Sequence, residues 1–434
     1  MTHTNHPTKG AIELSDQKRR LMQEMLRKRG DAGRLTATTT IRPRETDSAP
    51  PLSFAQQRLW FLEQLTPNSS AYVFTNLVRL SGPLNVVALR KSLAEIIDRH
   101  ENLRTGFSDD DGLLRQIVFE QIDLSIPLLD LADLPPEQRE DGLQQAVAKN
   151  SAEPFDLSAP PLIRLQVIRL AEKEYALILT MHHIIYDGWS LTVLFEELQA
   201  LYVALEQEQP SPLSPLPVQF ADYADWQRQH VDSGQLEKQL DYWRKQLSAP
   251  LPTLALPTDR PRPDVLGYAG KVEWFHLSTG LSAQLRTLAN REDCTLFTVL
   301  LAAFNVLLHR YTGDSEILVG TPVAGRNQSE VEKLIGFFVN TLAIRTPIKG
   351  NSSFSGLLSS VRATMSDALD NQDLPFEILV DELQPERHAN QNPVFQTMFA
   401  LQNTPPVPDS LGDVRMQIEE VDNGTSVFDI TLSM

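Results

Sequence analysis

Apolar residues along the chain recur at two spacings, and these predict the order of its helices and strands. Runs in which apolar side chains alternate, or follow one another over a few positions, are typical of strands. Apolar residues three and four positions apart are typical of a helix with one buried face. The strand-like runs are residues 72–80, 160–170, 175–181 and 317–321, and the helical runs are residues 51–65, 84–100, 191–202 and 293–311. This mixture predicts an α/β protein in which 160–170 and 175–181 pair as a hairpin.

Proline-rich stretches predict how the chain is divided. Residues 250–270 are rich in proline, and we expect the boundary between two lobes there, with an N-terminal lobe over 51–250 and a C-terminal lobe over 251–434. Residues 1–50 differ in composition and predict a leader helix followed by a linker. Two interpretations of this leader remain open, which are a frayed, solvated segment and a docking helix for an upstream protein.

Composition and charge limit the class of protein. With 434 residues the chain is too long for one ordinary core, and 41% apolar and 22% charged residues are typical of a soluble globular protein. No apolar run approaches the ~20 residues that span a bilayer. The net charge of −17 argues against nucleic acid or an anionic membrane as partner. The single cysteine, Cys294, fits a reducing compartment, so we expect a cytoplasmic protein.

Two adjacent histidines supply the candidate chemistry. His182 and His183 follow the strand-like run 175–181, and Asp187 and Gly188 precede the helical run at 191–202. Since neighbouring strand side chains point to opposite faces, only one histidine can face a given cavity. A histidine can give or take a proton near neutral pH. The residues alone leave three interpretations open, which are a catalytic pair, a buried core histidine beside a surface one, and a metal site.

The pattern His-His-x-x-x-Asp-Gly over residues 182–188 resembles the signature of condensation domains of non-ribosomal peptide synthetases. These domains belong to the chloramphenicol-acetyltransferase-like superfamily. The other core motifs of the family are matched in the same order, and the first, Ser53-x-Ala-Gln-x-Arg-Leu-Trp60, resembles the subtype that accepts an L-configured donor. The further matches lie at residues 99–105, 220–227, 320–327 with 335–341, 370–377 and 387–393, where Asn371 replaces the usual histidine of the sixth motif.

The resemblance implies a fold and a reaction. It implies two pseudo-symmetric acetyltransferase-like lobes in a V with a central tunnel, and a chain that is a fragment of a larger synthetase. A carrier-bound acyl or peptidyl thioester would be the donor and a carrier-bound aminoacyl thioester the acceptor of amide formation. His183 would act as general base or only orient the amine, with His182 and Gly188 supporting it. Asp187 would point away from the tunnel and form a structural ion pair with Arg99 or Arg104.

The resemblance also implies further site residues and partners. Ser190, Trp226, Arg326 and Asn340 are candidates for the tunnel or its loops, and Arg326 with Phe337 and Phe338 is a candidate carrier-docking patch. We expect upstream and downstream carrier proteins and neighbouring synthetase domains as partners. The substrates would be carried on phosphopantetheine, and the domain itself would bind no metal, nucleotide, coenzyme, nucleic acid or membrane.

Alternatives to amide formation stay open. An epimerisation domain shares the histidine motif, a variant condensation domain could form an ester or dehydrate a bound serine, and an inactive domain could only dock carriers. A cyclisation domain is excluded, because residues 182–187 lack the Asp-x-x-x-x-Asp pattern of that subtype.

Overall fold

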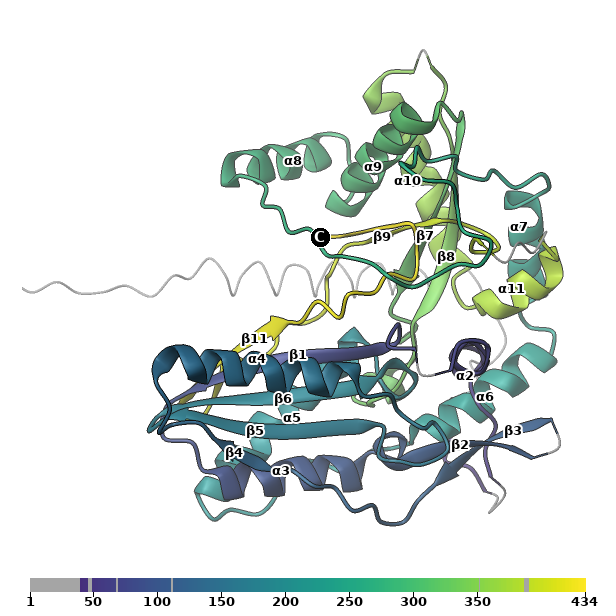
Figure 1. Cartoon of the computed structure of the whole chain (residues 1–434). Helices are drawn as coiled ribbons and strands as arrows, with labels where there is room; N and C mark the ends of the chain where they lie inside the picture. Colours follow the sequence, from purple (N-terminus) through teal and green to yellow (C-terminus); the bar gives the residue numbers. More distant parts are fainter. Residues whose placement is uncertain (1–39, 46–48, 68, 111, 351, 386–389) are drawn as a thin grey trace, which may run out of the picture. The chain divides into compact units, whose positions relative to one another are not determined.

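Two main β-sheets organise the computed structural model, which describes residues 40–45, 49–67, 69–110, 112–350, 352–385 and 390–434 (Figure 1). The first sheet has the strand order β10-β11-β1-β6-β5-β4, and the second has the order β12-β9-β7-β8. The helix expected within residues 14–29 lies outside the described residues. The strands of the first sheet are β1 (Val73–Ser81), β4 (Leu128–Asp130), β5 (Ile163–Ala171), β6 (Glu174–His182), β10 (Ser410–Leu411) and β11 (Val414–Glu420). Those of the second are β7 (Glu316–Val323), β8 (Asn340–Pro347), β9 (Thr397–Ala400) and β12 (Ile430–Ser433).

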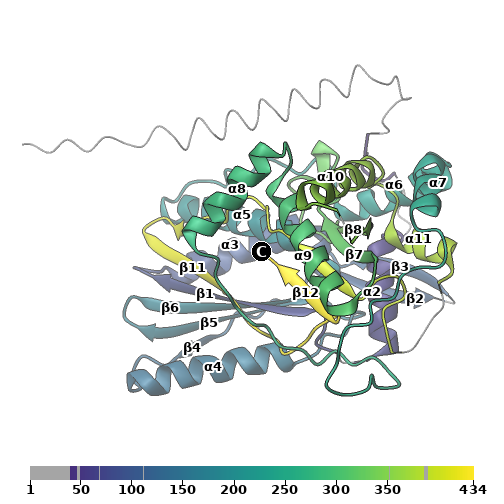
Figure 2. The ribbon, with the colours of Figure 1, turned by 90° about the horizontal axis from the view of Figure 1, so that it is seen from above.

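Alternation along the strands of the first sheet separates two apolar layers. Leu177, Leu179 and Met181 of β6 belong to a core shared with α3 and α5, whereas Ala176 and Ile178 face α4. Figures 1 and 2 show α4 on one face of this sheet and α3 with α5 on the other. The expected hairpin is confirmed, since β5 and β6 pair antiparallel. The helices of this region are α2 (Phe54–Leu65), α3 (Val86–Arg99), α4 (Pro136–Ala152), α5 (Gly188–Glu206) and α6 (Phe220–Asp232), and β2 (Thr105–Asp110) pairs with β3 (Leu113–Val118).

The second sheet has its own core, which α9 and α10 help to form. The apolar helix expected at 293–311 is confirmed as α9, whose Leu301 and Phe304 are buried against Phe399 of β9 and its neighbours. Side chains of α7, among them Trp243, belong to this second core although α7 precedes residue 250. The helices of this region are α7 (Glu237–Gln246), α8 (Thr279–Arg291), α9 (Leu296–Thr312), α10 (Phe354–Asp370) and α11 (Phe376–Leu383).

The chain crosses between the two regions more than once. Strand β11, which follows β9 in sequence, pairs with β1 in the first sheet and not with the second. With α7 in the second core, the division between the two cores does not fall at the proline-rich stretch 250–270 alone. The two regions are therefore not the contiguous lobes 51–250 and 251–434 that the proline content predicts.

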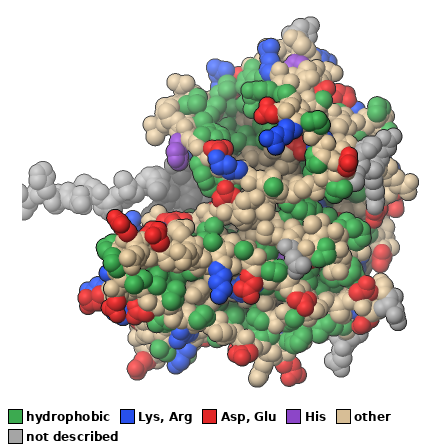
Figure 3. Space-filling view, viewed as in Figure 1, with side chains coloured by type: hydrophobic (Ala, Val, Ile, Leu, Met, Phe, Trp, Pro, Cys, Tyr) green, Lys and Arg blue, Asp and Glu red, His purple; other side chains and the backbone are tan. Residues whose placement is uncertain are grey.

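No single helix among the described residues is long and apolar enough to cross a membrane, although α8 and α9, which meet at a bend of 106°, would do so together by length and composition. Side chains of α9 that include Leu301 and Phe304 are buried in the second core. Figure 3 shows hydrophobic side chains gathered over α8 and α9, where Leu281, Leu307 and Tyr311 are exposed.

Candidate active site

The histidine motif lies where strand β6 ends and helix α5 begins. His182 is the last residue of β6, and His183–Ile185 form one turn of 3-10 helix. Asp187 is the N-cap of α5, because its Oδ1 accepts a hydrogen bond from the Ser190 backbone N–H at 2.8 Å. A capped helix on one side and a buried strand on the other hold the motif from both ends.

The His183 imidazole is held by one hydrogen bond and three aromatic rings. Its Nδ1 lies 2.8 Å from the carbonyl oxygen of Tyr186, and because a carbonyl only accepts, Nδ1 carries the proton. In the neutral ring, the lone pair is then on Nε2. The ring centroids of Phe337, Phe74 and Tyr186 lie 4.7, 5.0 and 5.3 Å from that of His183. We call these three rings the aromatic box.

Burial keeps His183 neutral. Desolvation lowers the pKa of His183 to about 4, and the positive charges of His182 and Arg58 act in the same direction. The carbonyl of Tyr186 and the carboxylate of Asp187 raise the pKa but do not compensate. An imidazole that is neutral at pH 7 and has a free Nε2 lone pair can accept a proton or a hydrogen bond from an amine.

The His182 ring has different neighbours, which agrees with the expected alternation. Its Nδ1 accepts a hydrogen bond from the Ile184 N–H at 3.1 Å, so Nε2 carries the proton of the neutral ring. That Nε2 lies 3.9 Å from Oε2 of Glu63 in α2, and Phe155 meets the ring edge to face. His182 is 1% exposed and fixes the backbone turn that presents His183.

The expected partners of Asp187 are wrong. The Asp187 carboxylate is fully buried and pairs with Arg326, whose Nη2 lies 3.1 Å from Oδ1. Arg99 instead pairs with Glu197 of α5 at 2.9 Å, and Arg104 donates to the carbonyl of Phe119. Both arginines are engaged by these other groups, so neither pairs with Asp187.

Arg326 belongs to a segment from the second region that reaches into the first. The Asp187 Oδ2 accepts from the Phe338 N–H at 3.0 Å, and Ser190 Oγ accepts from the Gly336 N–H at 3.0 Å. The His100 Nδ1 accepts from the Ile335 N–H at 3.3 Å. We call residues 332–339 the inserted loop, because its Ile335 and Phe337 belong to the core of the first sheet.

Gly336 is required where the inserted loop touches α6. A Cβ atom at this position would lie 2.0 Å from Cδ2 of Phe220, far inside van der Waals contact. Only glycine therefore allows the loop backbone to approach the Phe220 ring, and this close approach brings Phe337 to His183.

The remaining candidates have structural neighbours. Ser190 is 1% exposed and bridges Asp187 to the inserted loop, while Trp226 stacks on His230. The Asn340 side chain donates to the carbonyls of Gln372 and Leu374, and so holds the turn before α11. Gly188 is exposed, and a Cβ there would meet nothing within 4 Å, so space is open in front of it.

The expected carrier-docking patch is wrong. Arg326 is 8% exposed, and Phe337 and Phe338 are each 3% exposed, so none of the three presents a surface to a partner protein. The guanidinium of Arg326 instead lies 4.0 Å from the centre of the Phe338 ring, and the phenyl rings pack inward.

Two features of the site were missed from the sequence. Phe74 reaches the His183 ring because β1 pairs with β6, with Phe74 opposite Met181. The alternation in residues 72–80 predicts a strand but not its partner. Phe337 comes from 154 positions further along the chain, and the Gly-Phe-Phe run within 335–341 was its only signal.

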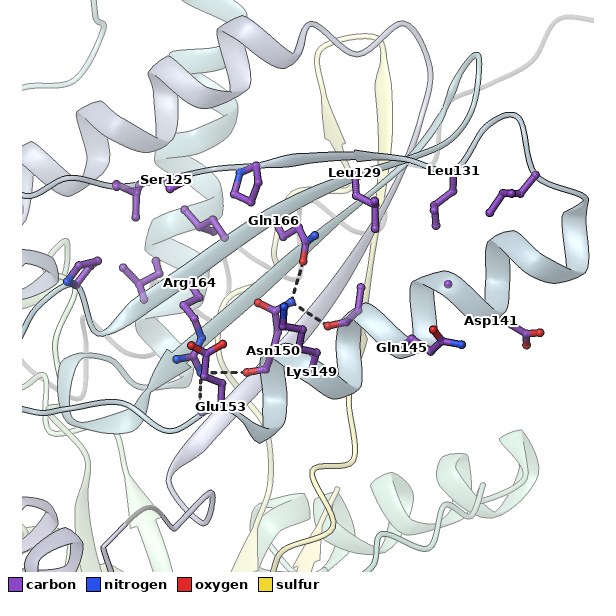
Figure 4. A pocket seen from close by; sticks show the side chains of 18 of the residues that line it. Ser125, Leu129, Leu131, Asp141, Gln145, Lys149, Asn150, Glu153, Arg164 and Gln166 are labelled. Carbon is purple, nitrogen blue, oxygen red and sulfur yellow. Dashed lines mark hydrogen bonds between the residues drawn. The ribbon is translucent and has the colours of Figure 1, made fainter.

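A cavity of about 980 Å³ lies elsewhere, between α4 and the strands β4 and β5 (Figure 4). Its polar groups bond to one another: Asn150 donates to Gln166 Oε1 at 2.9 Å, and Arg164 donates to the Asn150 carbonyl at 3.0 Å. His183 does not line it. Within the described ranges, no group of three His, Cys, Asp or Glu residues is placed to hold a metal ion.

Comparison with known proteins places these features in a family. The sequence model of the Condensation domain family matches residues 47–434. A protein of the linear gramicidin synthase of Brevibacillus parabrevis is 46% identical over 407 residues, which are 93% of this chain but 8% of that protein. The chain therefore spans less than a tenth of the length of this relative.

Solved structures show the same fold. The X-domain from teicoplanin biosynthesis superposes with a TM-score of 0.79 at 25% identity, over 88% of this chain and 84% of that one. The first condensation domain of the CDA synthetase superposes with a TM-score of 0.72 at 21% identity, over 89% of each chain. These likenesses confirm the expected mixed α/β acetyltransferase-like fold.

Proposed function

This chain belongs to the condensation-domain family, and on that premise we propose that it forms an amide bond between two carrier-bound substrates. The amine of an aminoacyl thioester attacks the carbonyl carbon of an acyl or peptidyl thioester. A C–N bond forms, the C–S bond breaks, and the donor's thiol leaves with the proton that the amine gives up. The product is a peptidyl chain, longer by one residue, on the acceptor carrier.

The protonation state of His183 is the observation that carries this proposal. Its Nδ1–H is held by the Tyr186 carbonyl at 2.8 Å, and the low pKa of the ring leaves Nε2 unprotonated at neutral pH. An unprotonated Nε2 can accept the amine proton as the C–N bond forms. It can equally hold the neutral amine by a hydrogen bond, and such positioning can supply a large part of a rate enhancement.

Asp187 supports the site without touching the substrates. Its carboxylate is buried and bonds to Arg326, to Ser190 and to the backbone of Phe338. We propose that it holds the turn after His183, while the open space at Gly188 leaves room for a substrate.

The partners in this proposal are an upstream and a downstream carrier protein, each with a phosphopantetheine arm. We also propose that the domain binds no metal or diffusible coenzyme of its own. The preference for an L-configured donor remains a prediction from the motif at residues 53–60. Acyltransferase chemistry is the coarser class into which both the amide-forming and the ester-forming reactions fall.

The test is a condensation assay with a donor-loaded and an acceptor-loaded carrier, in which mass spectrometry follows the product. His183→Ala is expected to lower the rate by about 10²–10⁴-fold, because a positioned proton acceptor is lost. His276→Ala is the matched control, since His276 is exposed and far along the chain from the motif. Circular dichroism should show that both variants are folded.

Three outcomes would contradict the proposal. If His183→Ala keeps a rate within a few-fold of the unchanged protein, His183 is not the working group. An unextended donor whose α-carbon is inverted would indicate an epimerisation domain. Equal rates with a carrier-bound acceptor and with the same amino acid as a free coenzyme thioester would rule out the dependence on carriers.

A further inference from the structure

The aromatic box around His183 is assembled from two distant parts of the chain. Phe74 and Tyr186 come from the first sheet and the turn after it, whereas Phe337 comes from the inserted loop. Of the three rings, Phe337 lies closest to the imidazole, with 4.7 Å between centroids and an angle of 51° between the planes. The ring of Phe337 is 3% exposed, so it fills its place in the box fully.

The inserted loop is fixed by bonds from its backbone, and this sets where the Phe337 side chain lies. The N–H groups on both sides of Phe337, those of Gly336 and Phe338, donate to Ser190 Oγ and Asp187 Oδ2 at 3.0 Å each. One residue earlier, the Ile335 N–H donates to His100. A residue held this closely on both sides has little freedom to move away from His183.

We propose that Phe337 is a positioning residue of the site, whose ring completes the box that orients the His183 imidazole and excludes water from it. The two parts of the chain must therefore be joined at the inserted loop before His183 can work. This inference rests on the proposed function of His183 and adds a second residue to it, one that touches the imidazole and not the reacting atoms.

The charges around His183 would be unchanged by altering Phe337. The ionisable groups that act on the imidazole are Asp187 at the start of α5, His182 at the end of β6 and Arg58 on α2, and the Tyr186 carbonyl holds Nδ1. None of them belongs to the inserted loop. Opening the box at Phe337 would thus mainly admit water, and hydration favours the protonated imidazole.

The test is an NMR titration of His183 with histidine labelled at Cε1 and at the ring nitrogens. His183→Gln identifies the His183 signal among the nine histidines. In Phe337→Ala the pKa of His183 should rise by about one unit or more toward the ordinary value, with a smaller rise in Phe337→Leu. Phe338→Leu is the matched control, because Phe338 is the next residue of the loop but stacks on Arg326. It should leave the His183 titration unchanged.

Kinetics supply the second readout. In Phe337→Ala we expect kcat to fall by about tenfold or more with KM for both carriers within about twofold, since orientation is lost and not binding. An unchanged His183 titration and an unchanged ring-nitrogen pattern in both Phe337 variants, whatever the rate, would overturn the proposal. If Phe337→Ala does not fold, Phe337→Leu alone decides. The titration needs no substrate, so its result stands apart from the outcome of the condensation assay.

Discussion

Replacing Arg326 by alanine should unfold the protein at markedly lower urea concentration. The side chains of Arg326 and Asp187 are each 1% exposed, and their closest atoms are 3.1 Å apart. The same guanidinium donates to the carbonyls of Val331 and Leu334 at 2.6 and 2.8 Å. Arg326→Ala therefore removes the cation and leaves two carbonyls without this donor.

The size of the effect follows from what remains after the change. The Asp187 carboxylate keeps its bonds from the Ser190 N–H, the Ser190 hydroxyl and the Phe338 N–H, but it loses its counter-charge while still buried. Removing one partner of a buried ion pair costs about 3–5 kcal/mol of unfolding free energy. Because the two residues share one network, Asp187→Asn with Arg326→Met should cost less than the sum of the single changes, by about 1 kcal/mol or more.

Urea denaturation followed by tryptophan fluorescence measures these differences. Arg79→Ala is the control, because Arg79 forms solvent-exposed pairs with Glu140 and Glu419 that contribute about 0–1 kcal/mol. If Arg326→Ala costs no more than Arg79→Ala, or if the double variant is strictly additive, the pair does not join the two parts of the chain as argued.

Two further changes test the packing and the protonation of the site. Gly336→Ala should destabilise the protein by about 1–3 kcal/mol, because the new methyl group would lie 2.0 Å from the Phe220 ring, and a thermal midpoint equal to that of the unchanged protein would contradict this. Since the pKa of His183 is about 4 when folded and about 6.5 when unfolded, the unfolded chain binds the proton first, and stability should fall as the pH drops from 6.5 to 4. Between pH 7.5 and 5 this contribution reaches up to about 2 kcal/mol, and it should be missing in His183→Gln when urea curves at the two pH values are compared.

Local patterns predicted the support of the site well. The alternation in 160–170 and 175–181 reflects two strands that each bury one face, so the hairpin and the position of His183 at its end followed from residues close in sequence. Asp187 lies directly before an apolar helical run, which is where a capping acid is expected.

The partners across the site could not be read in the same way. Arg326 is 139 positions from Asp187, and no spacing rule links a capping acid to an arginine at that separation. The family resemblance indicated Arg99 or Arg104, but Glu197 of α5 already pairs with Arg99. Burial of Phe337 likewise depends on a loop that joins another core, which a local hydrophobic pattern does not reveal.

The pairing of β11 with β1 bears on how this chain acquires its structure during synthesis. Asn76 lies opposite Glu420 and Ser81 opposite Arg415, so this edge of the first sheet is completed by residues made more than 330 positions later. Until the ribosome has released them, β1 presents an unpaired edge beside apolar side chains. Contacts at such separation form slowly and leave the nascent chain exposed to aggregation. A shortened chain that ends before residue 414 should therefore need chaperones more than the full one does.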